Sequence, residues 1–157
     1  MIIPDDIALW IQRNFEVLAS DDFSLAYFAS GNMDRIPDYS AARWQLAVDT
    51  LYRLIRSGLL KVHQYIRCSD EDTFFEAIRT VSPYGGDGML WNGTLVYGTP
   101  KLDELFRAFF TSDGSEWEDL NPRFIEALEQ IFADNGVPWS DKPLLPIAPS
   151  EEAAAAR

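Results

Sequence analysis

The segment between Ser40 and Gly58 carries the strongest structural signal in this sequence. Its apolar residues recur every three or four positions, as on one side of an α-helix. They are Trp44, Ala47, Val48, Leu51, Leu54 and Ile55. Ser40 is a good N-terminal cap, and Gly58 supplies the left-handed exit that commonly ends a helix. The sequence therefore predicts one long amphipathic helix, with Arg43, Arg53 and Arg56 off its apolar side.

Four further segments show helical spacing of apolar residues. One helix is expected from about Asp5 to Ala19, and another after Ser69, which resembles a capping box with Asp72. Two more begin at Thr99-Pro100 and Asn121-Pro122, where a capping residue precedes a proline.

Two shorter sequence signals complete the helical part of the prediction. Asn135-Gly136 is expected to end the last long helix. Phe23–Ala29 fits one or two helical turns.

The β-structure signal is confined to two regions. Leu59–Ile66 predicts a strand. Met89–Trp91 and Thr94–Tyr97 flank Asn92-Gly93, a pair suited to a type I′ turn, so the sequence predicts a short hairpin there. Because an isolated hairpin is only marginally stable, it should join the Leu59–Ile66 strand or pack on helices.

The chain length and composition predict one domain. With 157 residues, 47% of them apolar, the chain suits a single core. The expected fold is α+β and mostly helical, with about five helices and a small antiparallel sheet. Residues 1–140 should form the globular domain. Residues 141–157 are rich in proline and then alanine, so we expect a partly disordered tail. Trp139 and Leu144-Leu145 are expected to hold part of it against the domain.

The net charge of −12 is concentrated in the second half of the chain. Residues 1–68 carry eight acids and seven bases, whereas residues 69–157 carry seventeen acids and six bases. Phosphate groups repel such a surface, which argues against nucleic-acid binding. Negative charge of this kind speeds encounter with a basic protein. The alternative is that the acids serve solubility alone.

No segment indicates a membrane protein or an exported one. The longest apolar runs are far shorter than the ~20 residues of a membrane-spanning helix. The first residues lack the basic start and apolar stretch of a signal peptide. We therefore expect a cytoplasmic protein that does not enter a membrane.

The residue types that usually carry catalysis or bind metal are scarce. Cys68 is the single cysteine and His63 the single histidine, and their spacing on a strand and its exit places them on opposite faces. The loop Tyr84–Gly88 lacks the pattern of a phosphate loop, and the acidic clusters lack the spacing of a calcium-binding loop. We expect no catalytic residue, no metal site and no cofactor.

The acidic segment between the last two helices is the candidate binding site. Trp117 stands among Asp113, Glu116, Glu118 and Asp119. An aromatic anchor ringed by acids suits an interface with a basic partner. The alternative is that Trp117 folds back onto the core while the acids stay in solvent. Two acids of the last helix are expected to extend the same surface, namely Glu126 and Glu129.

Two stretches carry a resemblance to a known class of protein. Leu51–Leu60 is a helix that turns through Gly58 into a strand, and Trp91–Pro100 leads from the predicted hairpin into an aromatic helix. With its small size and acidity, the chain resembles bacterial immunity proteins of contact-dependent growth inhibition and related polymorphic-toxin systems. The resemblance implies stoichiometric occlusion of a cognate toxin domain, often a basic nuclease.

Two other functions remain open at this stage. One is an acidic secretion chaperone or adaptor that binds an extended effector segment on apolar grooves. The other is a small enzyme without a recognised motif. The partner recovered from the native host would separate the three.

The central helix generates the first prediction. Replacing Trp44 by alanine should lower the free energy of unfolding by roughly 3–5 kcal/mol, the usual effect of deleting a large core aromatic. Urea denaturation measures this difference. A loss below about 1 kcal/mol would place Trp44 outside the core.

Overall fold

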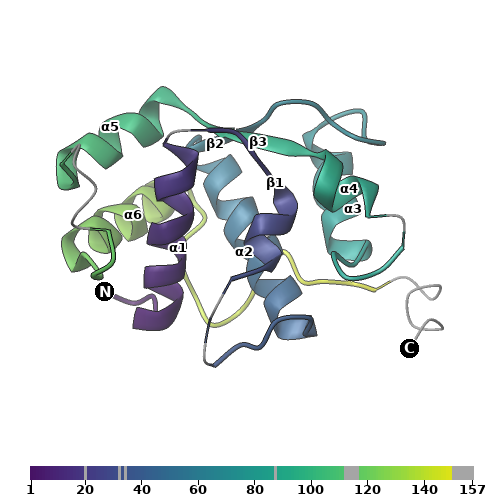
Figure 1. Cartoon of the computed structure of the whole chain (residues 1–157), viewed down its shortest axis with the longest axis horizontal. Helices are drawn as coiled ribbons and strands as arrows, with labels where there is room; N and C mark the ends of the chain where they lie inside the picture. The colour runs from purple at the N-terminus through teal and green to yellow at the C-terminus, as the bar shows by residue number, and fades with distance from the viewer. Residues whose placement is uncertain (20, 32, 34, 87, 112–116, 150–157) are drawn as a thin grey trace.

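The computed structural model describes residues 1–19, 21–31, 33, 35–86, 88–111 and 117–149. Within them, six α-helices and a three-stranded antiparallel sheet form a mostly helical α+β fold (Figure 1). The elements in chain order are α1 (Asp5–Leu18), β1 (Phe23–Ser24), the 3₁₀ helix η1 (Leu25–Ala29), α2 (Ala41–Arg56), β2 (Leu60–Val62), α3 (Glu71–Thr80), α4 (Met89–Gly93), β3 (Leu95–Gly98), α5 (Pro100–Phe109) and α6 (Pro122–Asp134).

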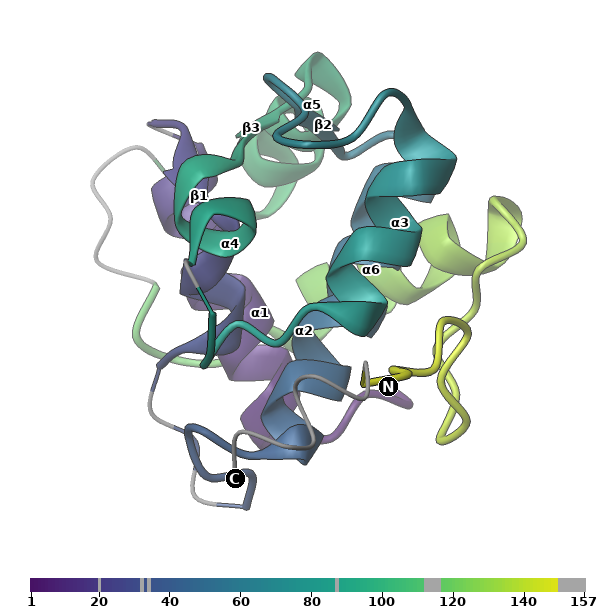
Figure 2. The same cartoon turned by 90° about the vertical axis from the view of Figure 1, so that its right-hand side faces the viewer.

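Helix α2 is the centre of the fold, as its sequence pattern predicts. Eleven of its sixteen residues are buried, which is far more than one apolar face requires. The Ser40 side chain accepts a hydrogen bond from the Arg43 amide, and Gly58 ends the helix with φ +75°. The buried Trp44 indole donates to the Ile78 carbonyl at 2.8 Å. Figure 2 faces α3 and α4, with α1, α2 and α6 behind them.

The prediction that the arginines of α2 lie off its buried side is wrong for two of them. Arg43 and Arg53 are fully buried. The segments that follow η1 and α6 cover this side of the helix and offer backbone carbonyls, so the guanidinium groups donate to Ser30, Gly31 and Pro138. Buried charges persist when their hydrogen bonds are made in this way.

The sheet is assembled from strands far apart in the chain. Its order is β1-β3-β2, and both pairings are antiparallel. Phe23 pairs with Val96, while Leu60 pairs with Gly98. The expected joining of the Leu95–Gly98 strand to the Leu59–Ile66 region is confirmed, although the strand there is only Leu60–Val62.

The predicted hairpin around Asn92-Gly93 is wrong. These residues end helix α4, which starts after Gly88 in a left-handed conformation with φ +64°. The fully buried Trp91 ring donates to the Val81 carbonyl at 2.6 Å. Burial of this ring against η1 and α3 therefore outweighs the turn preference of the dipeptide.

Two other local predictions need correction. The capping box of α3 joins Asp70 and Thr73, not Ser69 and Asp72, and its hydrogen bonds hold the pKa of Asp70 below the ordinary value. Phe23–Ala29 is only partly helical, because Phe23–Ser24 pairs with β3 before η1 begins. The starts of α5 and α6 at Pro100 and Pro122 are as predicted.

Residues 137–149 pass along α2 towards α3, as the yellow trace in Figure 1 shows. Side chains of α2 hold the main chain of this segment. The Asp49 carboxylate accepts from the amides of Leu144 (2.7 Å) and Leu145 (3.3 Å) and pairs with Arg53. Gln45 donates to the Leu145 carbonyl and accepts from the Ile147 amide.

The expected attachment of the tail is observed for Trp139 and Leu145, whereas the Leu144 side chain is exposed and only its amide is held, by the Asp49 carboxylate. Trp139 and Leu145 pack against the core, and the Arg53 guanidinium lies 4.8 Å from the centroid of the Trp139 ring. Residues 141–149 follow the body of the domain. The disorder expected at the end of the tail concerns residues 150–157, which lie outside the described part of the chain.

The Asp49–Arg53 pair generates the second prediction. Asp49→Ala should lower the free energy of unfolding by about 3–5 kcal/mol, because it leaves a buried guanidinium without its counterion. Hydrogen exchange at the Leu144 and Leu145 amides should accelerate as well. The control is Asp72→Ala, which removes an exposed partner of Arg56 and should cost under about 1 kcal/mol. Equal losses in the two variants would contradict the prediction.

Candidate functional site

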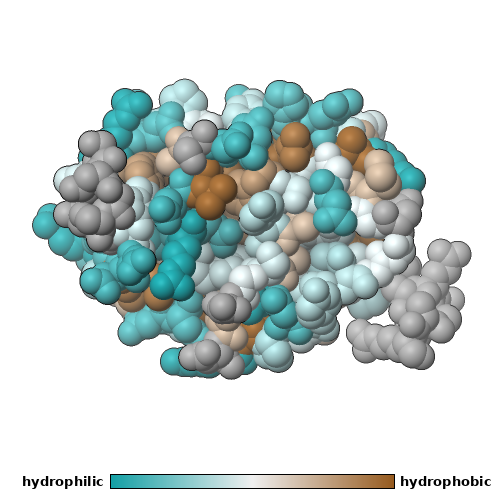
Figure 3. All heavy atoms as spheres, in the orientation of Figure 1, coloured by the Kyte–Doolittle hydropathy of each residue, from teal (hydrophilic) through white to brown (hydrophobic). Residues whose placement is uncertain are grey.

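The end of the molecule formed by α5 and α6 carries an excess of acidic residues. Residues 100–134 contain nine acids and three bases. Figure 3 shows many hydrophilic residues at this end, which we call the acidic end. Its exposed or half-exposed described carboxylates belong to Asp103, Glu104, Glu118, Asp119, Glu126 and Asp134.

The predicted site residues fall into three groups. Asp113 and Glu116 lie outside the described residues. Glu118, Asp119 and Glu126 are exposed, as expected for a binding surface. Glu129 differs from the expectation.

The side chain of Glu129 is only 12% exposed. Its carboxylate accepts hydrogen bonds from the amides of Ile2 and Ile3, the latter at 2.7 Å. Glu129 therefore attaches residues 2–3 to α6 and does not extend the open acidic surface.

Trp117 takes the alternative position, folded onto the core. It is 6% exposed, and its ring stacks on Phe106 at 3.9 Å and on Phe110 at 4.4 Å between centroids. The tryptophan consequently anchors the segment from inside. Glu118 and Asp119, the next two residues, are left in solvent.

Gln12 is the residue that sequence reasoning missed at the acidic end. Its fully buried amide donates to the carbonyls of Trp117 (3.1 Å) and Asp119 (2.9 Å) and accepts from the Asn121 amide (2.9 Å). One side chain thereby holds the main chain on both sides of Glu118, including that of Asp119. The sequence pattern could have indicated this role, because Gln12 is a polar residue on the apolar side of its helix, between Ala8 and Phe15.

Glu126 has a counterion, since its Oε1 lies 3.8 Å from the Met1 amino group, but four other carboxylates of the acidic end have none within the described residues. Among the described residues, no ion pair within 4 Å involves Asp103, Glu104, Glu118 or Asp119. Lys101, the nearby base on α5, donates instead to the Ser57 carbonyl at 2.7 Å. The negative charge of the acidic end is therefore directed towards solvent.

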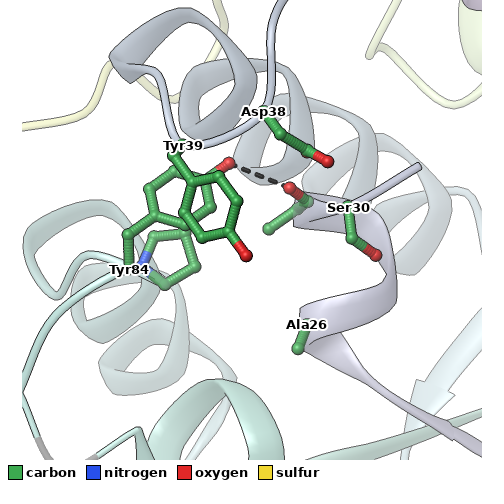
Figure 4. Close-up of a pocket in the computed structure, with 7 residues that line it drawn as sticks. Ala26, Ser30, Asp38, Tyr39 and Tyr84 are labelled. Atoms are coloured by element: carbon green, nitrogen blue, oxygen red, sulfur yellow. Dashed lines mark hydrogen bonds between the residues drawn. The ribbon is translucent and has the colours of Figure 1, made fainter. Parts of the chain in front are cut away.

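A second candidate is a small pocket lined by two tyrosines, which we call the tyrosine pocket (Figure 4). It has a volume of about 140 Å³ and lies between η1, the residues before α2 and the residues after α3. The rings of Tyr39 and Tyr84 form one wall, with Asp38 and Ser30 across the opening. The Tyr84 hydroxyl donates to the Ala29 carbonyl at 2.9 Å.

A second hollow, of about 240 Å³, lies between the start of α1, helix α2 and the residues after Trp139. Asp49 and Asp141 contribute its acidic groups. Both hollows are below the roughly 300–1,000 Å³ of small-molecule sites. They offer room for a partner's side chain more readily than for a cofactor.

The two residues with reactive side chains show no mutual arrangement for catalysis. His63 is exposed and lies 3.9 Å from the Asp22 carboxylate. Cys68 is half-buried, and burial with a smaller contribution from Asp70 raises the pKa of its thiol. A raised pKa disfavours the thiolate that acts as a nucleophile.

Two further searches concern the described part of the chain. There, no three histidine, cysteine, aspartate or glutamate residues come together in a group able to hold a metal ion. Among the same residues, no helix combines the length and apolarity needed to cross a bilayer.

Comparisons of the chain with protein-family models, curated proteins and solved structures give no match.

The tyrosine pocket generates the third prediction. Burial, with a smaller contribution from Asp38, raises the pKa of Tyr84 from 10.0 to about 12. In the unfolded chain this phenol ionises near pH 10, so its contribution to stability is complete below that pH and is lost as the pH rises towards 12. The free energy of unfolding of Tyr84→Phe should therefore decline less steeply over this interval. Identical slopes for the two proteins would contradict the prediction.

Proposed function

We propose that this chain is a protein-binding protein of the cytoplasm, namely an immunity protein that neutralises a basic toxin domain by stoichiometric occlusion. The observation that carries the proposal is the acidic end, where the exposed Glu118 and Asp119 lie on a well-anchored segment and make no ion pair within the described residues. The resemblance in Leu51–Leu60, where α2 turns through Gly58 into β2, points to the same class of protein.

The distribution of charge supports a basic partner. Arg43 and Arg53 are buried, and Arg56 and Arg79 pair with acids of α3. These arginines are therefore buried or paired within the fold, while acids of the acidic end are exposed to solvent. A surface of one sign accelerates association with a surface of the opposite sign, with an effect that falls as salt is added.

The anchoring of residues 117–121 supports binding by a preformed surface. Trp117 is stacked in the core, and Gln12 holds three main-chain groups of this segment. A surface that is ordered before binding loses less conformational entropy on association. Glu118 and Asp119 are therefore presented to a partner at low cost.

The acidic surface also suggests how inhibition works. A nuclease holds the phosphates of its substrate with basic side chains. Carboxylates at the acidic end compete for those same side chains when the two proteins associate. Occlusion of this kind requires no chemical step by the inhibitor.

The fourth prediction tests the acidic end with a double charge reversal, Glu118→Lys with Asp119→Lys. The partner to be tested is a basic toxin domain recovered together with this chain from its native host. The wild-type chain should restore growth of cells that express the domain. The variant should associate about tenfold or more slowly at low salt, because steering is lost. The difference should shrink as salt is raised.

The matched control is Glu71→Lys with Asp72→Lys, the same change of charge on α3. Figure 1 shows α3 at the opposite end of the molecule from α5 and α6. This control should associate at nearly the wild-type rate. Equal rates for all three proteins would remove the acidic end from the interface. Failure of the wild-type chain to restore growth, or recovery of an effector's extended segment from the host, would reject the immunity function.

A further inference from the structure

Tyr39 combines a large, exposed side chain with an unusual backbone conformation. It is 82% exposed, and its φ of +59° lies in the left-handed region that residues other than glycine seldom adopt. Backbone strain of this kind collects at functional sites, where surrounding contacts maintain it. The ring gains no burial from the strained conformation, so stability of the core does not explain it.

The buried Arg43 holds the main chain that leads from η1 towards Tyr39. Its guanidinium donates to the carbonyls of Ser30 (3.1 Å), Gly31 (2.7 Å) and Ile36. The Trp10 indole adds a further hydrogen bond to the Ser30 carbonyl at 3.1 Å. The walls of the tyrosine pocket are therefore set before any ligand arrives.

The pocket has the dimensions of a side-chain head group. The centroids of the Tyr39 and Tyr84 rings lie 5.2 Å apart with planes tilted by 47°. Ala26 and Ala29 are the small residues that leave about 140 Å³ beside the rings. Figure 4 shows the Asp38 carboxylate and Ser30 on the side of the opening that faces the two rings.

The chemistry of the lining favours a planar cation. The faces of tyrosine rings attract cations, and guanidinium groups stack on such rings while pairing with a carboxylate. Tyr84 stays neutral and keeps its ring available, because its pKa is about 12.

Asp38 provides the carboxylate. Its Oδ1 lies 3.6 Å from Arg43 Nη1, and its side chain is 39% exposed. A carboxylate accepts about four hydrogen bonds, so Asp38 retains capacity for a second guanidinium. Arg43 at the same time donates hydrogen bonds to three carbonyl groups.

We propose that the tyrosine pocket receives the guanidinium of one arginine side chain from the basic partner. That the arginine comes from a basic toxin rests on the proposed function. That the pocket recognises a guanidinium is a property of this chain alone. The arginine lies over the faces of Tyr39 and Tyr84 and donates to Asp38. The pocket thereby adds an anchor with defined geometry to the less directional attraction of the acidic end.

The fifth prediction uses a small probe on the full-length chain, followed by nuclear magnetic resonance of the backbone amides. Nα-acetyl-arginine methylamide should shift the amides of Ser30, Asp38, Tyr39 and Tyr84, with a dissociation constant on the order of millimolar. The matching citrulline compound has nearly the same shape and no charge, and it should leave these amides unshifted. Equal shifts with the two compounds, or none with either, would overturn the proposal.

Variants separate binding from folding. Tyr39→Gly should weaken the binding of the arginine probe by about tenfold. The melting temperature of this variant should stay the same or rise, since glycine adopts φ +59° without strain. Asp38→Asn should weaken the binding of the probe by a similar factor. Tyr27→Ala, which removes an exposed tyrosine outside the pocket lining, is the control and should bind as the wild type does. Unchanged affinity in Tyr39→Gly would also overturn the proposal.

The two proposals fail in different ways. Binding of the arginine probe without neutralisation of the toxin domain would reject the immunity function and support the pocket. Neutralisation that depends on Glu118 and Asp119, with no response to the arginine probe, would reject the pocket and retain the acidic end.

Discussion

Two buried arginines on α2 hold the irregular parts of this chain against its helices. Arg43 binds carbonyls of the segment after η1, and Arg53 pairs with Asp49 and binds the Pro138 carbonyl. Each guanidinium is removed from water, which is costly unless backbone carbonyls or an acid replace the lost hydration. The segments that supply those groups are therefore held in place by the two guanidinium groups. The tyrosine pocket and the course of residues 137–149 both depend on these contacts.

The same arrangement explains the uneven surface charge. Arg43 and Arg53 are buried and Arg56 and Arg79 pair with acids of α3, whereas acids of α5, α6 and the segment before α6 face solvent. The proposed partner would meet long-range attraction at the acidic end and a shaped, aromatic contact at the tyrosine pocket. The first affects the rate of encounter and the second affects which side chains fit.

Residues that look functional in the sequence turn out to be supports for others. The Trp117 ring is buried, and its stacking on Phe106 and Phe110 leaves Glu118 and Asp119 in solvent. Glu129 binds the amides of Ile2 and Ile3, while Glu126 of the same helix is exposed. Gln12 was not suspected, although a polar residue on an apolar helical face is itself a sign of a buried hydrogen-bonding role.

Local chemistry was enough to predict the long helices, since the spacing around Trp44, the cap at Ser40 and the prolines at 100 and 122 act within a few residues. The acidic character of the second half also follows from composition. Tertiary structure alone decided the short elements. Asn92-Gly93 favours a turn, yet burial of Trp91 makes the segment helical, and β3 finds its partners in β1 and β2. The burial of Arg43 and the pocket beside Tyr39 likewise depend on carbonyls brought close only by folding, which spacing along the chain does not encode.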